Sequence, residues 1–155
     1  MIIIGYQGIG KSSLAATNLK YIDLESSCFY YNGVRPDDWY RYYCNIAHHL
    51  SLQGYSVFVS SHEVVRNELK WYMDKGLEKV VCVYPSLSLK DDWIRKLANR
   101  YNNCSTEKNF KAWMNAVDRY EDNITEIKNC GIPGIEILSM DYVLEDLIGY
   151  DKSFD

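Results

Sequence analysis

The fold of this chain is limited most strongly by its first thirteen residues, MIIIGYQGIGKSS. Gly5 is followed by four residues and then by Gly10, Lys11 and Ser12, which completes the phosphate-loop pattern G-x-x-x-x-G-K-[ST]. β-Branched isoleucines precede the pattern, as in a short strand buried on both faces, and good helix formers follow it. The sequence therefore predicts the strand–loop–helix arrangement that phosphate binding by such a loop requires.

The loop residues have separate chemical tasks. Glycines permit positive φ and leave no Cβ in the way of an anion, so successive main-chain N–H groups can converge on phosphate oxygens. Lys11 has the length to reach the β- and γ-phosphates, and the Ser12 hydroxyl can bind Mg²⁺. The alternative is a glycine-rich turn without a ligand. We predict that eight residues bind the nucleotide, namely Gly5, Gln7, Gly8, Ile9, Gly10, Lys11, Ser12 and Ser13.

The length and the charge of the chain limit its number of domains and the kinds of partner that it can bind. A chain of 155 residues, 47% apolar and 25% charged, fits one globular domain, so we predict a single domain over residues 1–155. A net charge of −4 gives no general attraction to long nucleic acids or to anionic membranes. A small nucleotide partner needs only a local basic pocket and stays possible.

The cysteines and the lack of a long apolar run indicate the compartment. Five widely spaced cysteines include no C-x-x-C pair, which favours reduced thiols over a zinc site or a disulfide framework. No apolar run reaches the length of a membrane span. We therefore expect a cytoplasmic protein without a membrane partner.

Strands and helices alternate along the chain. We predict strands at residues 2–4, 21–25, 56–61, 79–84 and 135–138. We predict helices at residues 12–18, 36–54, 62–76, 89–101, 109–129 and 140–150, with residues 151–155 fraying at the end. Such alternation indicates right-handed crossovers and an α/β fold of three layers, in which helices cover both faces of a parallel sheet.

Other motifs distinguish the classes of phosphate-loop protein. A G-protein-like switch would carry an N-K-x-D motif to read the base, and the chain has none. A motor would carry an apolar strand ending in Asp, whereas the third predicted strand ends in Ser60-Ser61 and the fourth in Tyr84-Pro85. Small kinases tolerate this difference best, because the loop serine, phosphate oxygens and water can hold the metal.

The order of GYQGIGKSS, YIDLESS and VFVSSHEVVR, followed by long basic helices, resembles the nucleoside-monophosphate-kinase-like P-loop kinases. It looks most like their small, compact bacteriophage-type members. The resemblance covers nearly the whole chain in element order, although only the phosphate loop is highly specific. It implies a P-loop NTPase fold with five parallel strands in the order 2-3-1-4-5 and a mobile lid. It also implies host cytoplasm as the compartment, if a phage encodes the chain.

The second predicted strand ends in two acids, at the edge of the sheet where ligands of parallel sheets bind. Asp23 and Glu25 alternate, so they point to opposite faces unless the strand has already ended. We predict that Asp23 orients or deprotonates the acceptor or helps to hold Mg²⁺, and that Glu25 contacts the acceptor. The alternative is that these acids only cap the turn at Ser26 and Ser27.

Polar residues follow the third predicted strand, next to the loop in the expected order. We predict that Ser61, His62 and Arg66 contact the acceptor, because Arg binds phosphate bidentately. Ser61 could instead cap the following helix. Arg41 is a further predicted acceptor contact, and Arg35 is its rival as a phosphate anchor.

The helix over residues 89–101 is basic. Lys96 and Arg100 are four residues apart and Arg95 is adjacent, so two or three cations can share one face. The resemblance implies that this helix leads into the lid, predicted at about residues 102–111, and that Arg95 and Arg100 neutralise charge on the transferred phosphoryl group. The alternative is a solvated basic face paired with nearby aspartates.

The expected activity follows from the resemblance. We expect transfer of the γ-phosphoryl group of ATP, with Mg²⁺, to a small nucleotide acceptor, in particular a nucleoside or deoxynucleoside monophosphate. Lys11, Asp23, Arg95 and Arg100 are the predicted catalytic residues, and Ser12 and Asp23 the predicted metal ligands. Two alternatives stay open: a kinase of another small metabolite or of a nucleic-acid end, and an ATP-binding regulator with weak catalysis.

Overall fold

The computed structural model of the chain describes residues 1–152. Helix α6 (Leu144–Lys152) includes two of the five residues predicted to fray, and the other three, residues 153–155, lie outside the described part. Within residues 1–152, no helix combines the length and the apolar character needed to cross a membrane.

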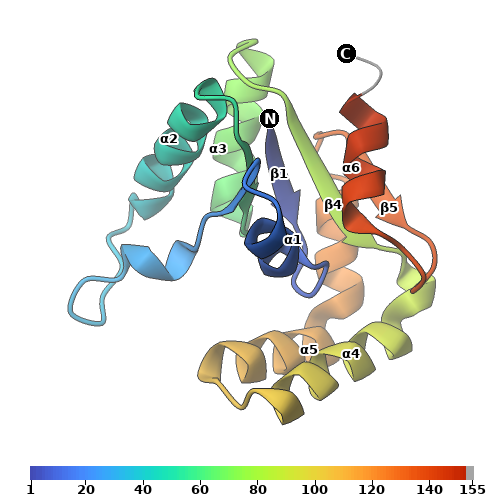
Figure 1. Cartoon of the computed structure of the whole chain (residues 1–155). Coiled ribbons are helices and arrows are strands. Elements are labelled where there is room, and N and C mark those ends of the chain that lie inside the picture. Colours follow the sequence, from blue (N-terminus) through green and yellow to red (C-terminus); the bar gives the residue numbers. More distant parts are fainter. Residues whose placement is uncertain (153–155) are drawn as a thin grey trace.

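Five parallel strands form one sheet in the order β2-β3-β1-β4-β5 (Figure 1). Their bounds are β1 (Ile2–Gly5), β2 (Tyr21–Asp23), β3 (Ser56–Val59), β4 (Val80–Pro85) and β5 (Gly134–Ile137). The predicted α/β class, the strand order and the parallel pairing are confirmed. The predictions for β2 and β3 were two residues too long, because both strands stop where the chain leaves the sheet to line a cavity.

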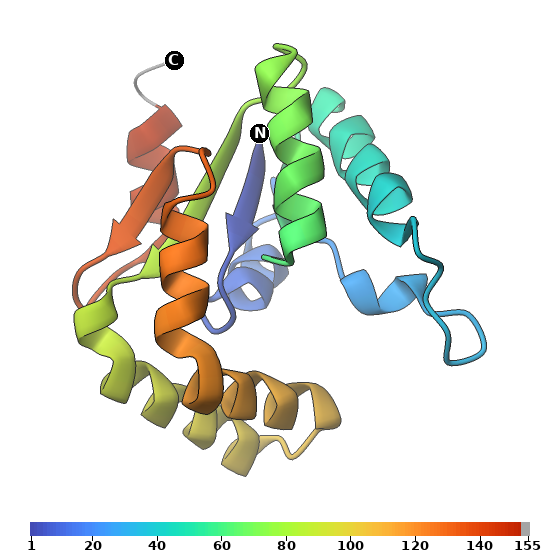
Figure 2. The same cartoon turned by 180° about the vertical axis from the view of Figure 1, so that it is seen from behind.

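Helices lie on both faces of the sheet. They are α1 (Lys11–Thr17), α2 (Trp39–Leu52), α3 (Glu63–Asp74), α4 (Lys90–Asn103), α5 (Glu107–Lys128) and α6, with short 3₁₀ turns η1 (Ser26–Phe29) and η2 (Leu87–Leu89). Figures 1 and 2 show α1 and α6 over one face, and α3 and the second half of α5 over the other.

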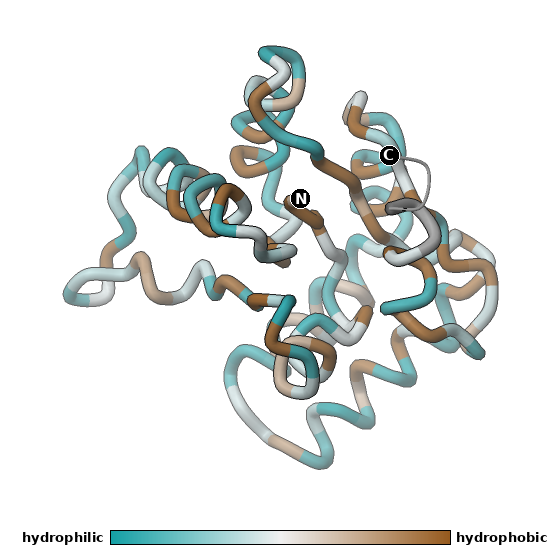
Figure 3. Tube along the Cα trace, turned by 45° about the horizontal axis from the view of Figure 1, so that its top comes forward, coloured by the Kyte–Doolittle hydropathy of each residue, from teal (hydrophilic) through white to brown (hydrophobic). Residues whose placement is uncertain are grey.

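The core lies between these layers. The isoleucines of β1 are fully buried, as are the residues of β3 from Val57 to Val59. In Figure 3 the chain next to the N-terminal label, β1, has the hydrophobic colour, whereas hydrophobic and hydrophilic colours alternate along the helices. On α5, Tyr120, Ile124 and Ile127 form a buried stripe at helical spacing. The central strands read as continuous apolar runs because helices cover them on both sides.

Helix α4 and the first half of α5 project beyond the carboxyl edge of the sheet, and we call residues 90–118 the arm (Figure 1). A kink separates the arm from the rest of α5, where Arg119 has φ −137° and ψ 17°. The segment predicted as a lid, residues 102–111, is the tip of the arm. It is mostly helical, because α4 continues to Asn103 and α5 begins at Glu107, where Thr106 accepts a hydrogen bond from Asn109 N–H.

Helix α2 begins three residues later than predicted. Pro36 does not occupy the first helical turn; its carbonyl instead accepts a turn hydrogen bond from Trp39 N–H. The Arg35 guanidinium lies 4.3 Å from the ring centroid of Tyr30 and 4.0 Å from that of Trp39. These contacts hold the preceding loop against the helix start, which favours the turn over an extra helical turn.

Candidate functional site

The loop between β1 and α1 uses its glycines in two ways. Gly8 and Gly10 have φ of +88° and +106°, a region that other residues rarely adopt. Gly5 does not have positive φ, but a Cβ there would lie 2.6 Å from Ile9 Cδ1 and 2.8 Å from Lys11 Cδ. Glycine at this position therefore allows the close approach of the Lys11 side chain.

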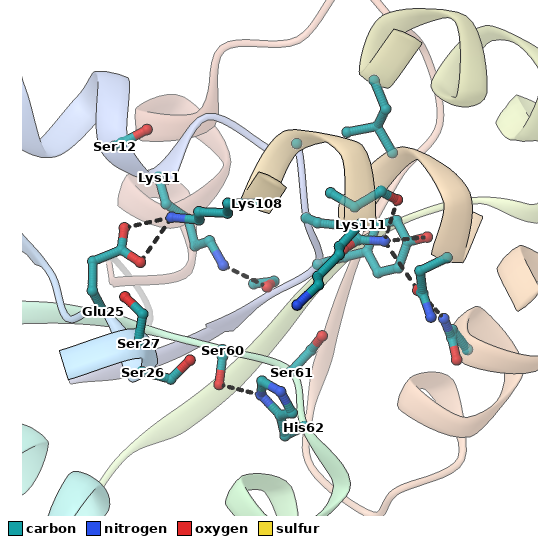
Figure 4. A pocket seen from close by; sticks show the side chains of 18 of the residues that line it. Lys11, Ser12, Glu25, Ser26, Ser27, Ser60, Ser61, His62, Lys108 and Lys111 are labelled. Atoms are coloured by element: carbon teal, nitrogen blue, oxygen red, sulfur yellow. Dashed lines mark hydrogen bonds and ion pairs between the residues drawn. The ribbon is translucent and has the colours of Figure 1, made fainter. Parts of the chain in front are cut away.

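A cavity of about 930 Å³ opens beside this loop, at the carboxyl ends of β1, β2 and β3. Its volume falls in the range of small-molecule and cofactor sites. The arm, η1 and the start of α3 form its other walls, as Figure 4 shows from close by. Eight Lys and Arg residues line it against five Asp and Glu residues, so the cavity is locally basic in an acidic chain. The eight cations are Lys11, Arg35, Arg66, Lys96, Arg100, Lys108, Lys111 and Arg119.

Lys11 folds back over the loop. Its Nζ donates to Gly5 O at 2.9 Å. Burial lowers the pKa of the Lys11 ammonium to about 8, while nearby Asp23 acts in the opposite direction. Ser12 and Ser13 line the same cavity and are exposed. The structure therefore brings these three predicted loop residues together.

Two other predicted loop residues have structural contacts. Gln7 lines the cavity, but its Nε2 donates to Ala112 O at 3.0 Å and to Asn115 Oδ1 at 3.1 Å, which ties the loop to the arm. Ile9 does not line the cavity. Its side chain is buried, so only its main chain can take part in binding.

Asp23 and Glu25 lie on the same side of the molecule. Because β2 ends at Asp23, the alternation expected for a strand does not apply, and both carboxylates line the cavity. Burial raises the pKa of Asp23, Lys11 counteracts this, and Glu25 adds to it. Glu25 is paired with Lys108, whose Nζ lies 2.7 and 2.8 Å from its two carboxylate oxygens (Figure 4).

The predicted metal ligands fit Mg²⁺ chemically. The Ser12 hydroxyl and the Asp23 carboxylate supply oxygen donors to one cavity, and oxygen is the ligand that Mg²⁺ prefers. Residues 1–152 contain no group of three or more His, Cys, Asp or Glu residues that could hold a metal. This donor set suits an ion that takes its remaining ligands from phosphates and water.

The residues after β3 also face the cavity. His62 Nδ1 lies 2.8 Å from Ser60 Oγ, and burial together with the nearby Arg35, Lys11 and Arg66 cations lowers its pKa. Arg66 is 7% exposed. It donates to Ser61 O, just before α3, at 3.0 Å and to Glu126 O, on α5, at 3.3 Å, so two of its donors are already engaged and the second holds α3 to α5.

Ser61 does not cap α3, which was one of its predicted alternatives. The N-cap position is His62, and no side-chain hydrogen bond is made there. The Ser61 side chain stays available to a ligand, since its only hydrogen bond among the described residues is accepted by its main-chain oxygen.

The structure distinguishes between the two arginines near α2 that were rival predictions for an anion contact. Arg35 lines the cavity, between Tyr30 and Trp39, and donates Nη2–H to Ser26 O at 3.1 Å. Its Nε is buried and has no hydrogen-bond partner among residues 1–152. Arg41, the predicted contact, does not line the cavity and is exposed beside the Tyr40 ring. Arg35 is therefore the better placed anchor for an anion.

Of the two arginines predicted on the arm, too, only one lines the cavity. Arg100 lines the cavity, and its Nε donates to Asn109 Oδ1 at 2.8 Å. Arg95 lies outside the cavity, and its exposed side chain pairs with Asp92 at 3.1 Å. Lys108 and Lys111, from the first turns of α5, also line the cavity, which places the cations of the arm tip opposite Lys11.

One wall of the cavity, formed by α5 on both sides of the kink, was not predicted from the sequence. Asn115, Arg119 and Asn123 recur every four residues, beside the apolar stripe, and all line the cavity. Their helical spacing was the available signal. Whether this spacing would face the cavity depended on the kink in α5 and on the angle at which α5 packs, and no local residue pattern specifies either.

Neither the comparison with protein-family models nor the search of curated proteins found a match for this chain. Its activity is therefore inferred from the residues and the geometry of the cavity.

Proposed function

We propose that this chain is an ATP- and Mg²⁺-dependent phosphotransferase of the P-loop kinase type. Its acceptor would be a small nucleotide, in particular a nucleoside or deoxynucleoside monophosphate. One observation carries the proposal: a single cavity joins the phosphate loop to carboxylate, hydroxyl and cationic side chains from four other parts of the chain. Phosphoryl transfer depends on this combination, because it is catalysed mainly by positioning and by neutralising charge.

Different residues of the cavity would bind the donor and the acceptor. The loop N–H groups and Lys11 would hold the donor phosphates, and Ser12 and Asp23 would hold Mg²⁺, which shields phosphate charge when bound. Arg100 approaches from the arm, where it would stabilise the transferred phosphoryl group. Arg35, which lines the same cavity as the hydroxyls that follow β3, would hold the anionic end of the acceptor.

The test is a phosphotransfer assay with matched variants. Purified protein, ATP and Mg²⁺ are incubated with each of a panel of nucleoside and deoxynucleoside monophosphates, and formation of ADP and phosphorylated acceptor is followed by chromatography. We expect ADP to form only with particular acceptors, and Lys11→Ala to abolish it. ATP binding without turnover on any monophosphate would reject the nucleotide acceptor.

A second candidate is an ATP-binding regulator. It is favoured by the residues after β3, the neighbour of β1, which are Ser60, Ser61 and His62 and not a carboxylate. This candidate predicts tight ATP binding and no ADP with any acceptor. Small hydroxyl compounds and an oligonucleotide with a free 5′-hydroxyl, added to the same panel, test the kinase of another metabolite or of a nucleic-acid end.

A further inference from the structure

Two side chains that do not line the cavity hold the phosphate loop from behind. Trp93, on α4, donates its Nε1–H to Gln7 O at 2.9 Å. Tyr142, in the segment before α6, donates its hydroxyl to Ile9 O at 2.8 Å. Helix α4 packs directly on the loop, since a Cβ on Gly8 would lie 3.2 Å from Trp93 Nε1. Alternate carbonyls of the loop are therefore fixed by elements distant in sequence.

These two bonds decide where the loop N–H groups point. A trans peptide is planar, so the carbonyl of one residue and the N–H of the next point in opposite directions. With the Gln7 and Ile9 carbonyls turned toward their donors, the N–H groups of Gly8 and Gly10 point away from them. Both glycines line the cavity, and in the described part of the chain neither N–H has a hydrogen-bond partner.

Lys96 fixes the direction of the Tyr142 hydroxyl. Its Nζ lies 2.9 Å from the hydroxyl oxygen, and an ammonium can only donate. The tyrosine must therefore accept from Lys96, which leaves its own hydrogen for Ile9 O. The same ammonium lies 4.4 Å from the ring centroid of Trp93 and 5.0 Å from that of Tyr142. Cation–π contacts thus join the three side chains into one support.

We infer that Trp93, Lys96 and Tyr142 are positioning residues that turn the Gly8 and Gly10 N–H groups toward the donor phosphates. The inference rests on the donor site of the proposed function and is independent of the acceptor. N–H groups fixed before the ligand arrives bind an anion more strongly, because less order must be imposed on binding.

The experiment measures binding of Mg²⁺-tripolyphosphate by calorimetry, so that no turnover is needed. Tyr142→Phe keeps the ring and removes only the hydroxyl, and we expect it to bind roughly three- to tenfold more weakly than the wild type. The matched control is Tyr120→Phe, which removes another buried hydroxyl, bonded to Ser86 O at 2.7 Å and not to the loop. The control should bind as the wild type does.

Two further readouts separate positioning from a general loss of structure. The indole N–H resonance of Trp93, identified by its absence in Trp93→Phe, should shift when Mg²⁺-tripolyphosphate is added. In the phosphotransfer assay, Tyr142→Phe should raise KM for ATP and leave KM for the acceptor unchanged.

The outcomes distinguish this inference from the proposed function. Wild-type binding that Tyr142→Phe leaves unchanged, or reduces no more than Tyr120→Phe does, overturns the inference alone. A wild type that does not bind Mg²⁺-tripolyphosphate overturns both the inference and the donor site.

Discussion

The surroundings of Lys11 disfavour the charged form of its side chain. Burial lowers the pKa of its ammonium to about 8, and Asp23 offsets this only in part. The side chain is charged below that pH and neutral above it. Because bound phosphates favour the charged form, we predict that the affinity for Mg²⁺-ATP falls as the pH rises through about 8, by up to about tenfold per pH unit above it.

Calorimetry between about pH 7 and about pH 9 measures this dependence, because it spans the lowered pKa of Lys11. Lys11→Met, which has no ammonium, should bind weakly at every pH and serves as the control. An affinity of the wild type that is constant over this range contradicts the prediction.

A second group at the residue scale, the Cys130 thiol, lies next to Arg66. Cys130 Sγ is 3.8 Å from Cys82 Sγ, and Cys82 is fully buried. The hydrogen bond with Cys82 lowers the pKa of the Cys130 thiol to about 6; burial opposes the shift, and Arg66 supports it. We predict that iodoacetamide modifies Cys130 in the folded protein with a rate that reaches half its maximum near the lowered pKa.

Mass spectrometry of the Cys130 peptide after short pulses at a series of pH values measures the rate. In urea-unfolded protein the midpoint should move to about 8.5, the ordinary cysteine value. Equal midpoints for the folded and unfolded protein would rule out the effect of Cys82 and Arg66.

At the scale of one element, α4 carries a matched pair of arginines. Arg100 lines the cavity, whereas Arg95 is exposed on another side and pairs with Asp92. We predict that Arg100→Ala lowers kcat by about a hundredfold or more, because a cation at the transferred phosphoryl group acts mainly in the transition state. Arg95→Ala should stay within about twofold, since an exposed ion pair contributes little. The phosphotransfer assay compares them, and equal losses would contradict these assignments.

The two arginines also show what the sequence can specify. Trp93 and Leu97 are four residues apart and form the buried stripe of α4. Arg100 follows this stripe at helical spacing, whereas Arg95 is two residues from Trp93 and faces elsewhere. The spacing of the apolar residues thus contained the distinction, and grouping the cations by proximity alone obscured it.

The alternation of strands and helices predicted the sheet well, because a buried parallel strand leaves a clear apolar run and glycines end the helices. The kink at Arg119 could not be predicted in this way, since neither Pro nor Gly stands there. That kink directs Asn115 and Asn123 to the same cavity. Residues of the cavity that depend on such long-range packing were missed, whereas seven of the eight residues predicted in the continuous loop line the cavity and Ile9 does not.

At the scale of the whole molecule, the distribution of charge matters more than its sum. The chain carries a net charge of −4, which alone would repel a polyanion, yet the cavity is lined by eight cations and five acids. Cations gathered around one cavity repel one another, and a bound polyphosphate relieves that repulsion. We predict that Mg²⁺-tripolyphosphate at about a hundred times its Kd raises the free energy of unfolding by about 2.7 kcal/mol.

Urea denaturation with and without the ligand measures this shift. Added sodium chloride should weaken it through screening of the cavity charges. Lys11→Ala tests whether the stabilisation arises at the loop: the variant should unfold at the same urea concentration with or without ligand. If it is stabilised as much as the wild type, the polyanion binds to another part of the surface, and the basic cavity is not its site.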